Sequence, residues 1–270
     1  MTAQADMRVV NLRKRFGRRE VLRGVTIDFA PGTITVVLGP SGCGKSVMMK
    51  HLVGLLRPDR GEVWFRTTRI DKLPERELGM VRRQIGFLFQ QSALFDSLTV
   101  RDNIAFPLRE HGMNESGLIE SKVRRVLSLV ALEETIDQMP AELSGGQRKR
   151  VALARAIVLE PRVVLYDEPT TGLDPIRSEV INQLILKLSI SLGITSIVVT
   201  HDLMSAYRIA DRMVLLHEGQ VALEGTPREF ETTDNPTARQ FLRGELGADE
   251  LARIRGSGDD AATQRGPQTP

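Results

Sequence analysis

The chain has 270 residues, a formal net charge of +3 and a hydrophobic content of 41%, which fit a soluble globular protein of one large domain or two small ones. Its single cysteine excludes an internal disulfide framework and favours a reducing compartment, and its few aromatic residues (4%) are not interleaved with basic ones, so nothing indicates a nucleic-acid partner. No stretch approaches the roughly 18 apolar residues of a membrane span, and the first ten residues lack the pattern of a signal peptide, so we expect neither.

Predicted strands and helices alternate along most of the chain, which favours a parallel α/β sheet with right-handed crossovers. Alternating or continuous apolar residues predict strands at residues 7–16, 25–29, 33–38, 62–67, 85–89, 162–166, 195–200, 212–217 and 220–223. Helical spacing with proline starts and glycine stops predicts helices at residues 47–56, 74–83, 147–159, 175–192, 227–231 and 236–242. Residues 97–146 are helical in character and interrupt this alternation, so we expect an inserted helical subdomain. Apolar content falls beyond residue 245, which predicts a polar, disordered tail.

The segment between the third strand and the first helix fits G-x-x-x-x-G-K-[ST], the pattern of a phosphate-binding loop. It consists of Gly39, Pro40, Ser41, Gly42, Cys43, Gly44, Lys45 and Ser46, and Val47 follows in the helix. Glycines allow a tight turn whose N–H groups point inward, and the helix adds the positive end of its dipole. Lys45 would reach the β- and γ-phosphates of a nucleotide, and the Ser46 hydroxyl would bind Mg²⁺. The alternative is a glycine-rich turn that binds nothing, which the strand before it and the helix after it disfavour.

Polar side chains follow three other predicted strands, at the edge where parallel sheets bind ligands. Gln90 follows the fifth strand, Asp167 and Glu168 follow the sixth, and His201 follows the seventh. The Asp167 carboxylate would hold Mg²⁺ opposite Ser46, and Glu168 would polarise a water molecule for in-line attack on the γ-phosphate. The alternatives are a solvated loop for the Asp–Glu pair and a structural role for the histidine.

A second candidate anion site precedes the helix predicted at residues 147–159. Ser144 would cap this helix, and Gly145 and Gly146 would expose N–H groups beside its positive end. The same segment could equally be an ordinary capped helix start. Two half-sites for one triphosphate, in different subdomains, suggest a head-to-tail dimer that holds each ATP between two copies of the chain.

Taken together, these motifs resemble the ATP-binding subunits of ABC transporters. In the order of that family, the chain contains GPSGCGKS, a glutamine after IGFLF, LSGGQ, VVLYDE, PTTGLD and a histidine after a strand, and the resemblance covers about residues 7–245. It implies that the residues of the LSGGQ signature bind the ATP of a partner copy: Ser144, Gly145, Gly146 and Gln147. It also implies that Asp174 lies at the dimer interface and that Gln90 links Mg²⁺ and water to the transporter interface. His201 would lie near the γ-phosphate.

The resemblance implies a fold and an enzymatic activity. The fold would be that of a P-loop NTPase, with a RecA-like parallel sheet, an antiparallel β part near the N-terminus and an inserted α-helical subdomain. The ATPase domain would span residues 7–245, with its core at 7–95 and 150–245 and its helical subdomain at about 96–149. Residues 246–270 would form the polar tail. The activity would be hydrolysis of ATP with Mg²⁺.

Phe16 stands at the turn between the first two strands, after a basic run. The residues alone leave two interpretations open, a core or hairpin aromatic side chain or a face on which an adenine ring stacks. The resemblance implies the second, although tyrosine is commoner at that position of the family.

Residues 88–111 and the later segment PTARQFL resemble, more narrowly, the ATPases of lipid-transport systems of the Mla and Mce type. This implies phospholipid transport through a separate MlaE-like permease, at the cytoplasmic face of the bacterial inner membrane. A lipid-binding periplasmic component and a small STAS-domain protein would be further partners. Because LSGGQRKR is the general form of the signature, an importer of amino acids or other small solutes is the alternative. A soluble ABC ATPase without a transporter, or a P-loop kinase, fits less well.

Overall fold

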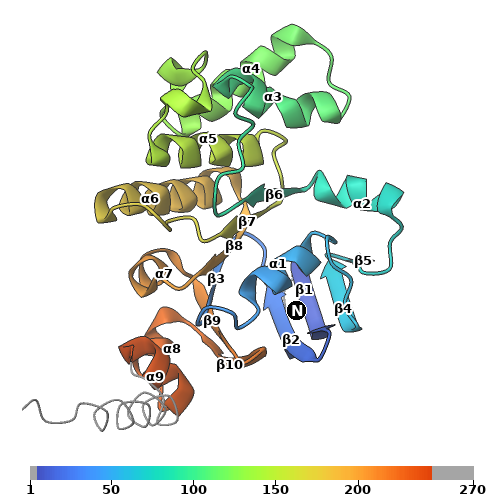
Figure 1. The fold of residues 1–270 in the computed structure, drawn as a ribbon, viewed down its shortest axis with the longest axis vertical. Coiled ribbons are helices and arrows are strands. Elements are labelled where there is room, and N and C mark those ends of the chain that lie inside the picture. The colour runs from blue at the N-terminus through green and yellow to red at the C-terminus, as the bar shows by residue number, and fades with distance from the viewer. Residues whose placement is uncertain (1–4, 245–270) are drawn as a thin grey trace, which may run out of the picture.

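The computed structural model describes residues 5–244, which form two β-sheets with helices packed around them (Figure 1). The strands are β1 (Met7–Phe16), β2 (Arg19–Phe29), β3 (Ile34–Leu38), β4 (Arg60–Phe65), β5 (Thr68–Arg69), β6 (Ile85–Leu88), β7 (Val163–Asp167), β8 (Thr195–Thr200), β9 (Arg212–His217) and β10 (Gln220–Gly225). The α-helices are α1 (Lys45–Leu52), α2 (Glu75–Arg82), α3 (Val100–Glu110), α4 (Ser116–Leu129), α5 (Gly145–Ile157), α6 (Pro175–Leu192), α7 (Leu203–Ile209), α8 (Pro227–Glu231) and α9 (Pro236–Arg243). Two 3-10 helices span Glu133–Thr135 and Pro140–Glu142. The tail predicted at residues 246–270 lies outside the described residues.

The central sheet has six strands in the order β10-β9-β3-β8-β7-β6, and every neighbouring pair except β10 and β9 runs parallel. All residues of β3 and β8 are buried, as expected for central strands of a parallel sheet, and the apolar runs VVL in β3 and IVV in β8 reflect this burial. The predicted parallel α/β sheet is therefore confirmed. Because β3, β6, β7 and β8 point in one direction, the polar residues that follow them meet at one edge of the sheet.

The second sheet is antiparallel, has the order β2-β1-β4-β5 and packs beside the central sheet (Figure 1). β2 begins at Arg19 rather than at residue 25, because it pairs with β1 directly across the turn, with Phe16 opposite Arg19. The buried carboxylate of Asp6 joins the two sheets. It accepts hydrogen bonds from the Thr195 hydroxyl and from the Arg162 guanidinium, each at 2.7 Å. The antiparallel β part expected near the N-terminus is thus present, with α1 packed between the two sheets.

The helical segment between β6 and β7 forms a separate layer at the top of Figure 1. Apolar side chains of α3, α4, α5 and α6 share one buried core. Two helices begin two residues earlier than predicted, α1 at Lys45 and α5 at Gly145. α5 starts there because the Ser144 hydroxyl accepts a hydrogen bond from the Gln147 amide and caps the helix. Within residues 5–244, no helix combines the length and apolar character needed to cross a lipid bilayer.

Candidate functional site

The loop between β3 and α1 approaches its neighbours so closely that only glycine fits at two positions. A Cβ atom on Gly39, whose φ is 153°, would lie 2.2 Å from the carbonyl oxygen of Leu216. A Cβ atom on Gly44, whose φ is 111°, would lie 2.7 Å from a methyl group of Leu22. The loop is therefore fixed between β9 and β2, which supports the tight turn expected of a phosphate-binding loop.

Lys45 and Cys43 are both buried in this loop, at 7% and 6% exposure. The Lys45 ammonium donates hydrogen bonds to the carbonyl oxygens of Gly39 at 2.6 Å and Pro40 at 3.1 Å. An incoming phosphate group would compete with these carbonyls for the ammonium. The Cys43 thiol packs in the apolar core, and burial raises the pKa of Cys43. The thiol therefore has a packing role, and the Cys43 amide donates a hydrogen bond of 3.4 Å to the Pro40 carbonyl oxygen within the loop.

A hollow of about 290 Å³ lies over the loop and brings together nine of the predicted site residues. Its lining consists of Val21, Ser41, Gly42, Gly44, Lys45, Ser46, Val47, Gln90, Glu168 and His201. All of these except Val21 were expected at the site. The convergence follows from the parallel sheet, since Gln90, Glu168 and His201 come after β6, β7 and β8. The hollow therefore unites a cation, backbone amides, a carboxylate and an imidazole.

Asp167 and Ser46 lie close together at the edge of the hollow. The Ser46 hydroxyl donates a hydrogen bond of 3.3 Å to the Asp167 carboxylate. Burial raises the pKa of Asp167, and the negative charge of Glu168 adds to the rise. No group of three or more His, Cys, Asp or Glu residues suited to a metal occurs among residues 5–244. A hydroxyl and one carboxylate nevertheless fit Mg²⁺, which prefers oxygen ligands and takes several of them from water and substrate phosphates.

Glu168 is held in an unusual backbone conformation, with a φ of 50°. Its carboxylate accepts hydrogen bonds from the hydroxyls of Thr171 at 3.1 Å and Thr200 at 3.4 Å. The Nδ1 atom of His201 lies 3.0 Å from the same carboxylate. Left-handed backbone at a non-glycine residue persists only where surrounding contacts enforce it. The contacts with Thr171, Thr200 and His201 are of this kind. The sequence analysis did not anticipate the direct contact between His201 and Glu168.

The remaining predicted residues lie outside the hollow. Gln147 and Ser144 hydrogen-bond reciprocally at the start of α5, so the predicted cap is confirmed. A Cβ atom on Gly145 would lie 3.9 Å from Leu173, and Gly146 is adjacent to Arg177 in the same way, so the signature packs beside the start of α6. That start is capped by Asp174, whose carboxylate accepts a hydrogen bond from the Arg177 amide.

Phe16 is 47% exposed at the end of β1, with the Lys14 ammonium 5.6 Å from its ring centre. Phe16 is therefore not a core residue, and its exposed ring is compatible with an aromatic residue of the hairpin surface and with a face for an adenine ring. In the same hairpin, the Arg19 guanidinium donates a hydrogen bond of 3.4 Å to the Gly42 carbonyl, so the hairpin contacts the phosphate loop. Neither Arg19 nor Val21 was predicted, because nothing in the local sequence pattern shows which loop the hairpin meets.

Lys149 is a further polar residue that the sequence analysis missed. It is 6% exposed on α5, and its ammonium donates to the carbonyl oxygens of Gln90 and Glu168. A signal was available, because Lys149 precedes the buried Leu153 and Ile157 by four and eight residues and so falls on the apolar face of its helix.

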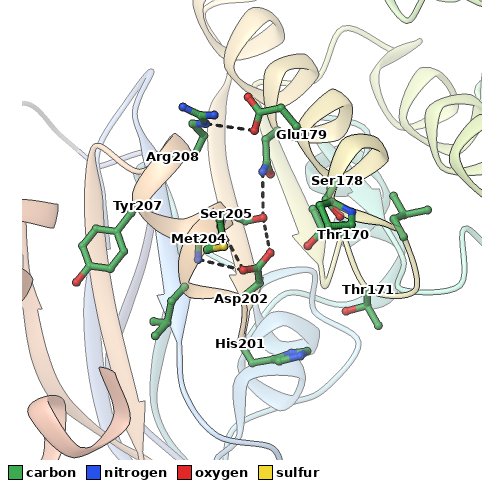
Figure 2. Close-up of a pocket in the computed structure, with 14 residues that line it drawn as sticks. Thr170, Thr171, Ser178, Glu179, His201, Asp202, Met204, Ser205, Tyr207 and Arg208 are labelled. Atoms are coloured by element: carbon green, nitrogen blue, oxygen red, sulfur yellow. Dashed lines mark hydrogen bonds and ion pairs between the residues drawn. The ribbon is translucent and has the colours of Figure 1, made fainter. Parts of the chain in front are cut away.

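A larger hollow, of about 1010 Å³, lies between α6 and α7 (Figure 2). His201 lines this hollow as well as the smaller one. The Arg208 guanidinium, which also lines the larger hollow, is paired with the Glu179 carboxylate at 3.2 Å. The Asp202 carboxylate accepts a hydrogen bond of 2.6 Å from the Ser205 hydroxyl. With its charged groups paired in this way, the larger hollow lacks the convergent donors that phosphates require, and the smaller hollow is the better nucleotide site.

Comparisons with known proteins agree with this geometry. The sequence model of a family described as "ABC transporter" matches residues 22–171. The chain belongs to the ABC transporter family. It is 41% identical over 237 residues to "Intermembrane phospholipid transport system ATP-binding protein MlaF" of Haemophilus influenzae, covering 88% of this chain and 90% of that protein. It is 42% identical to "Probable ribonucleotide transport ATP-binding protein mkl" of Mycobacterium tuberculosis, covering 88% and 67%.

Solved structures of ABC cassettes share the fold. A dimeric structure of the cassette MJ0796 bound to ADP and Pi superposes with a TM-score of 0.75 at 34% identity, covering 82% of this chain and 99% of that one. The cbiO1 protein of Clostridium perfringens, part of a transporter complex, superposes with a TM-score of 0.79 at 29% identity, covering 94% and 99%. The predicted P-loop NTPase fold is therefore confirmed. As an ATP-binding subunit of the ABC family, the chain is an ATPase.

Proposed function

We propose that this ABC ATPase works as a head-to-tail dimer that drives phospholipid transport through a separate membrane permease. The similarity to MlaF, which extends over 90% of that protein, is the observation that carries the lipid assignment. An Arabidopsis thaliana chloroplastic protein named for trigalactosyldiacylglycerol is 41% identical and supports the same class of substrate. The name of the mycobacterial relative favours a nucleotide substrate instead, so a different importer is the second candidate.

The residues of the smaller hollow suggest how ATP is hydrolysed. Lys45 and the loop amides bind the β- and γ-phosphates, with Ser46, Asp167 and Gln90 as the groups that would hold Mg²⁺. When bound, this ion neutralises charge on the phosphate oxygens. Glu168 accepts a hydrogen bond from the attacking water and polarises it toward the γ-phosphorus. Ser41, Gly42, Gly44 and Val47 line the hollow and would bind phosphate through their backbone amides. Gly39, Pro40 and Cys43 complete the turn of the loop, and Pro40 has no N–H group to donate.

His201 acts on this step through two contacts in the proposal. Its Nδ1 atom lies 3.0 Å from the Glu168 carboxylate and orients it, and its 59% exposed ring faces the hollow, where the γ-phosphate would lie. Phe16 stacks on the adenine ring at the outer end of the site. Its 47% exposure and the contact between the neighbouring Arg19 and the phosphate loop support that assignment.

A second copy of the chain completes each site in this proposal. The signature residues Ser144, Gly145, Gly146 and Gln147 do not line the hollow that contains Lys45. They lie instead beside Leu173, which is next to Asp174 in the chain. The signature and the Asp174 segment are therefore neighbours on one surface of the chain. A partner placed head to tail would bring this surface to the γ-phosphate. The dimeric arrangement of the MJ0796 cassette bound to ADP and Pi supports this reading.

The helical subdomain, at about residues 96–149, is the part that we propose meets the permease, whereas residues 7–95 and 150–245 form the ATPase core. Phe95 and Phe106 are 42% and 38% exposed, and their ring centres lie 4.8 Å apart. Phe95 follows Gln90 by five residues, so this exposed aromatic pair is a candidate surface to which changes at the nucleotide site could be transmitted. We propose an MlaE-like permease there, with a lipid-binding periplasmic component and a STAS-domain protein as further partners at the cytoplasmic face of the inner membrane.

The catalytic part of the proposal is tested by Glu168→Gln. We expect ATP turnover to fall by about 10²–10⁴-fold while ATP binding persists, because the amide keeps the shape of the side chain but accepts no proton. An ATP-bound dimer should accumulate and be visible by size-exclusion chromatography. Glu133→Gln changes an exposed carboxylate outside the hollow and serves as the control. Near-normal turnover by Glu168→Gln would remove Glu168 from this role.

Two further measurements test the dimer and the substrate. Chains with Lys45→Ala and chains with Ser144→Arg should each be inactive, and mixing them should restore weak activity because one of the two sites in a mixed dimer carries neither change. Absence of recovery when mixed dimers form would argue against shared sites. For the substrate, the complex with its permease should move fluorescent phospholipid between vesicles only with ATP. Uptake of ribonucleotides without lipid transfer would favour the second candidate.

A further inference from the structure

A buried lysine on α5 joins the two strand ends that carry the proposed catalytic groups. Lys149 is only 6% exposed, and its ammonium donates a hydrogen bond of 3.0 Å to the carbonyl oxygen of Gln90. A second hydrogen bond, of 3.2 Å, goes to the carbonyl oxygen of Glu168. One side chain thus bridges the segment after β6 and the segment after β7. The two residues that it contacts, Gln90 and Glu168, are 78 positions apart in the sequence.

The contact with Glu168 falls where the backbone most needs support. Glu168 has a φ of 50°, in the left-handed region that a non-glycine residue occupies only when its surroundings enforce it. Its amide is held by the Val199 carbonyl at 2.9 Å, and its carbonyl is held by Lys149. Lys149 therefore fixes the peptide group that follows Glu168, and with it the direction in which the carboxylate leaves the backbone.

The charge of Lys149 is also well placed. Burial lowers the pKa of Lys149, and the negative charges of Glu168 and Asp167 oppose this shift. A buried cation with two carbonyl acceptors and two nearby carboxylates is compensated, whereas removal of the ammonium would take one donor from each carbonyl and leave the Glu168 carbonyl with the Thr171 amide. Leu153 and Ile157 occupy the same buried face of the helix, so an apolar side chain could fill the position of Lys149. Packing alone therefore does not explain why a lysine is present.

Lys149 lies on the second turn of the helix whose first turn carries the signature. Ser144 caps α5 and Gly145 begins it, so the signature and the ammonium belong to one continuous helix. We propose that Lys149 is a positioning residue that couples the signature end of α5 to the hydrolysis site of the same chain, by holding Gln90 and Glu168 in register. This inference rests on the proposed function, in which the signature contacts ATP bound by the partner copy.

The first test compares Lys149→Met, Lys149→Arg and a matched control in steady-state ATP hydrolysis. Lys149→Met should lower kcat by about ten- to hundredfold and leave KM for ATP within about threefold, because the positioning of groups is lost rather than nucleotide binding. Lys149→Arg retains a charged donor and should recover kcat to within about fivefold of the wild type. Arg150→Met is the control. It removes a neighbouring cation that donates to the carbonyls of Val130 and Ala131, away from the site, and kcat should stay within about threefold.

The second test does not depend on activity and uses hydrogen exchange of the full-length chain without nucleotide. The Ser92 amide is bonded to the Phe89 carbonyl at 2.9 Å, and the Thr171 amide to the Glu168 carbonyl at 3.3 Å. In Lys149→Met, both amides should exchange faster than in the wild type, and in Arg150→Met neither should. Unchanged exchange at both amides, or equal losses of kcat in Lys149→Met and Arg150→Met, would overturn the inference. A wild type without ATPase activity would instead refute the proposed function, and the exchange data would still decide the role of Lys149.

Discussion

The pH dependence of stability that His51 causes can test the packing behind the phosphate loop. His51 is 1% exposed near the end of α1, the helix that begins with Lys45 and Ser46. Its Nδ1 atom lies 2.7 Å from the Val47 carbonyl oxygen and must donate its hydrogen there, since a carbonyl only accepts. The buried Nε2 atom has no hydrogen-bond partner within the described part of the chain, so a proton on it would be unpaired. Burial accordingly lowers the pKa of His51, and the Val47 carbonyl opposes the shift only in part.

The direction of the pKa shift sets the pH dependence. The folded-state pKa of His51 lies below the unfolded value of about 6.5, so the unfolded chain binds the proton first as the pH falls. The stability contributed by the neutral ring is therefore present above pH 6.5 and is lost as the pH falls toward the folded-state pKa. One proton changes the free energy of unfolding by at most about 1.4 kcal/mol per pH unit. Between pH 6.5 and 5.5 the loss should thus reach up to about 1 kcal/mol, because the unfolded-state site is already half-titrated at the start.

The assay is urea unfolding of the wild type and of His51→Leu at several pH values between 7.5 and 5.5, without nucleotide. Subtracting the two curves cancels the titration of all other groups, so the difference isolates His51. Leu52→Ala, a change to a fully buried neighbour, is the control and should shift stability equally at every pH. If the wild type and His51→Leu lose stability in parallel as the pH falls, the ring is not held neutral and the reasoning is wrong.

Three further outcomes follow from the described contacts. Gly39→Ala should weaken ATP binding by at least about tenfold in calorimetry, because its Cβ atom would lie 2.2 Å from the Leu216 carbonyl oxygen, and unchanged affinity would show that the loop is held less tightly. Tyr166→Phe should leave the free energy of unfolding in urea unchanged or raise it by up to about 1 kcal/mol, because the buried hydroxyl makes no hydrogen bond of normal geometry within residues 5–244, and a clear loss would show that it pairs with the nearby Ser196 hydroxyl. Phe106→Ala combined with Arg109→Glu should preserve ATP binding by the isolated subunit and reduce permease-stimulated hydrolysis by at least about fivefold, whereas undiminished stimulation would place the coupling surface elsewhere.

The sequence by itself determined the elements whose signals are local. The helix Pro175–Leu192 was predicted with its observed bounds, because a proline begins it and Gly193, at a φ of 63°, ends it. The strand Thr195–Thr200 was also predicted with its observed bounds, because the β-branched residues Ile, Val and Val at its centre are typical of a buried parallel strand. The phosphate loop was also readable, because its chemistry depends on residues that are adjacent in the chain. The site assignments themselves remain predictions.

Only the tertiary structure decided the contacts between segments that are distant in the chain. His201 reaches Glu168 because β7 and β8 are neighbours in the sheet, and no local pattern reports which strands pair. Helical spacing places Lys149 on the apolar face of α5, but only the packing of that helix shows that its ammonium contacts two strand ends. The early start of β2 was missed for the same reason, because hydrogen bonding to β1, rather than its own alternation, extends that strand. Local patterns fix the elements, whereas burial and pairing, which depend on the whole chain, determine what each polar side chain contacts.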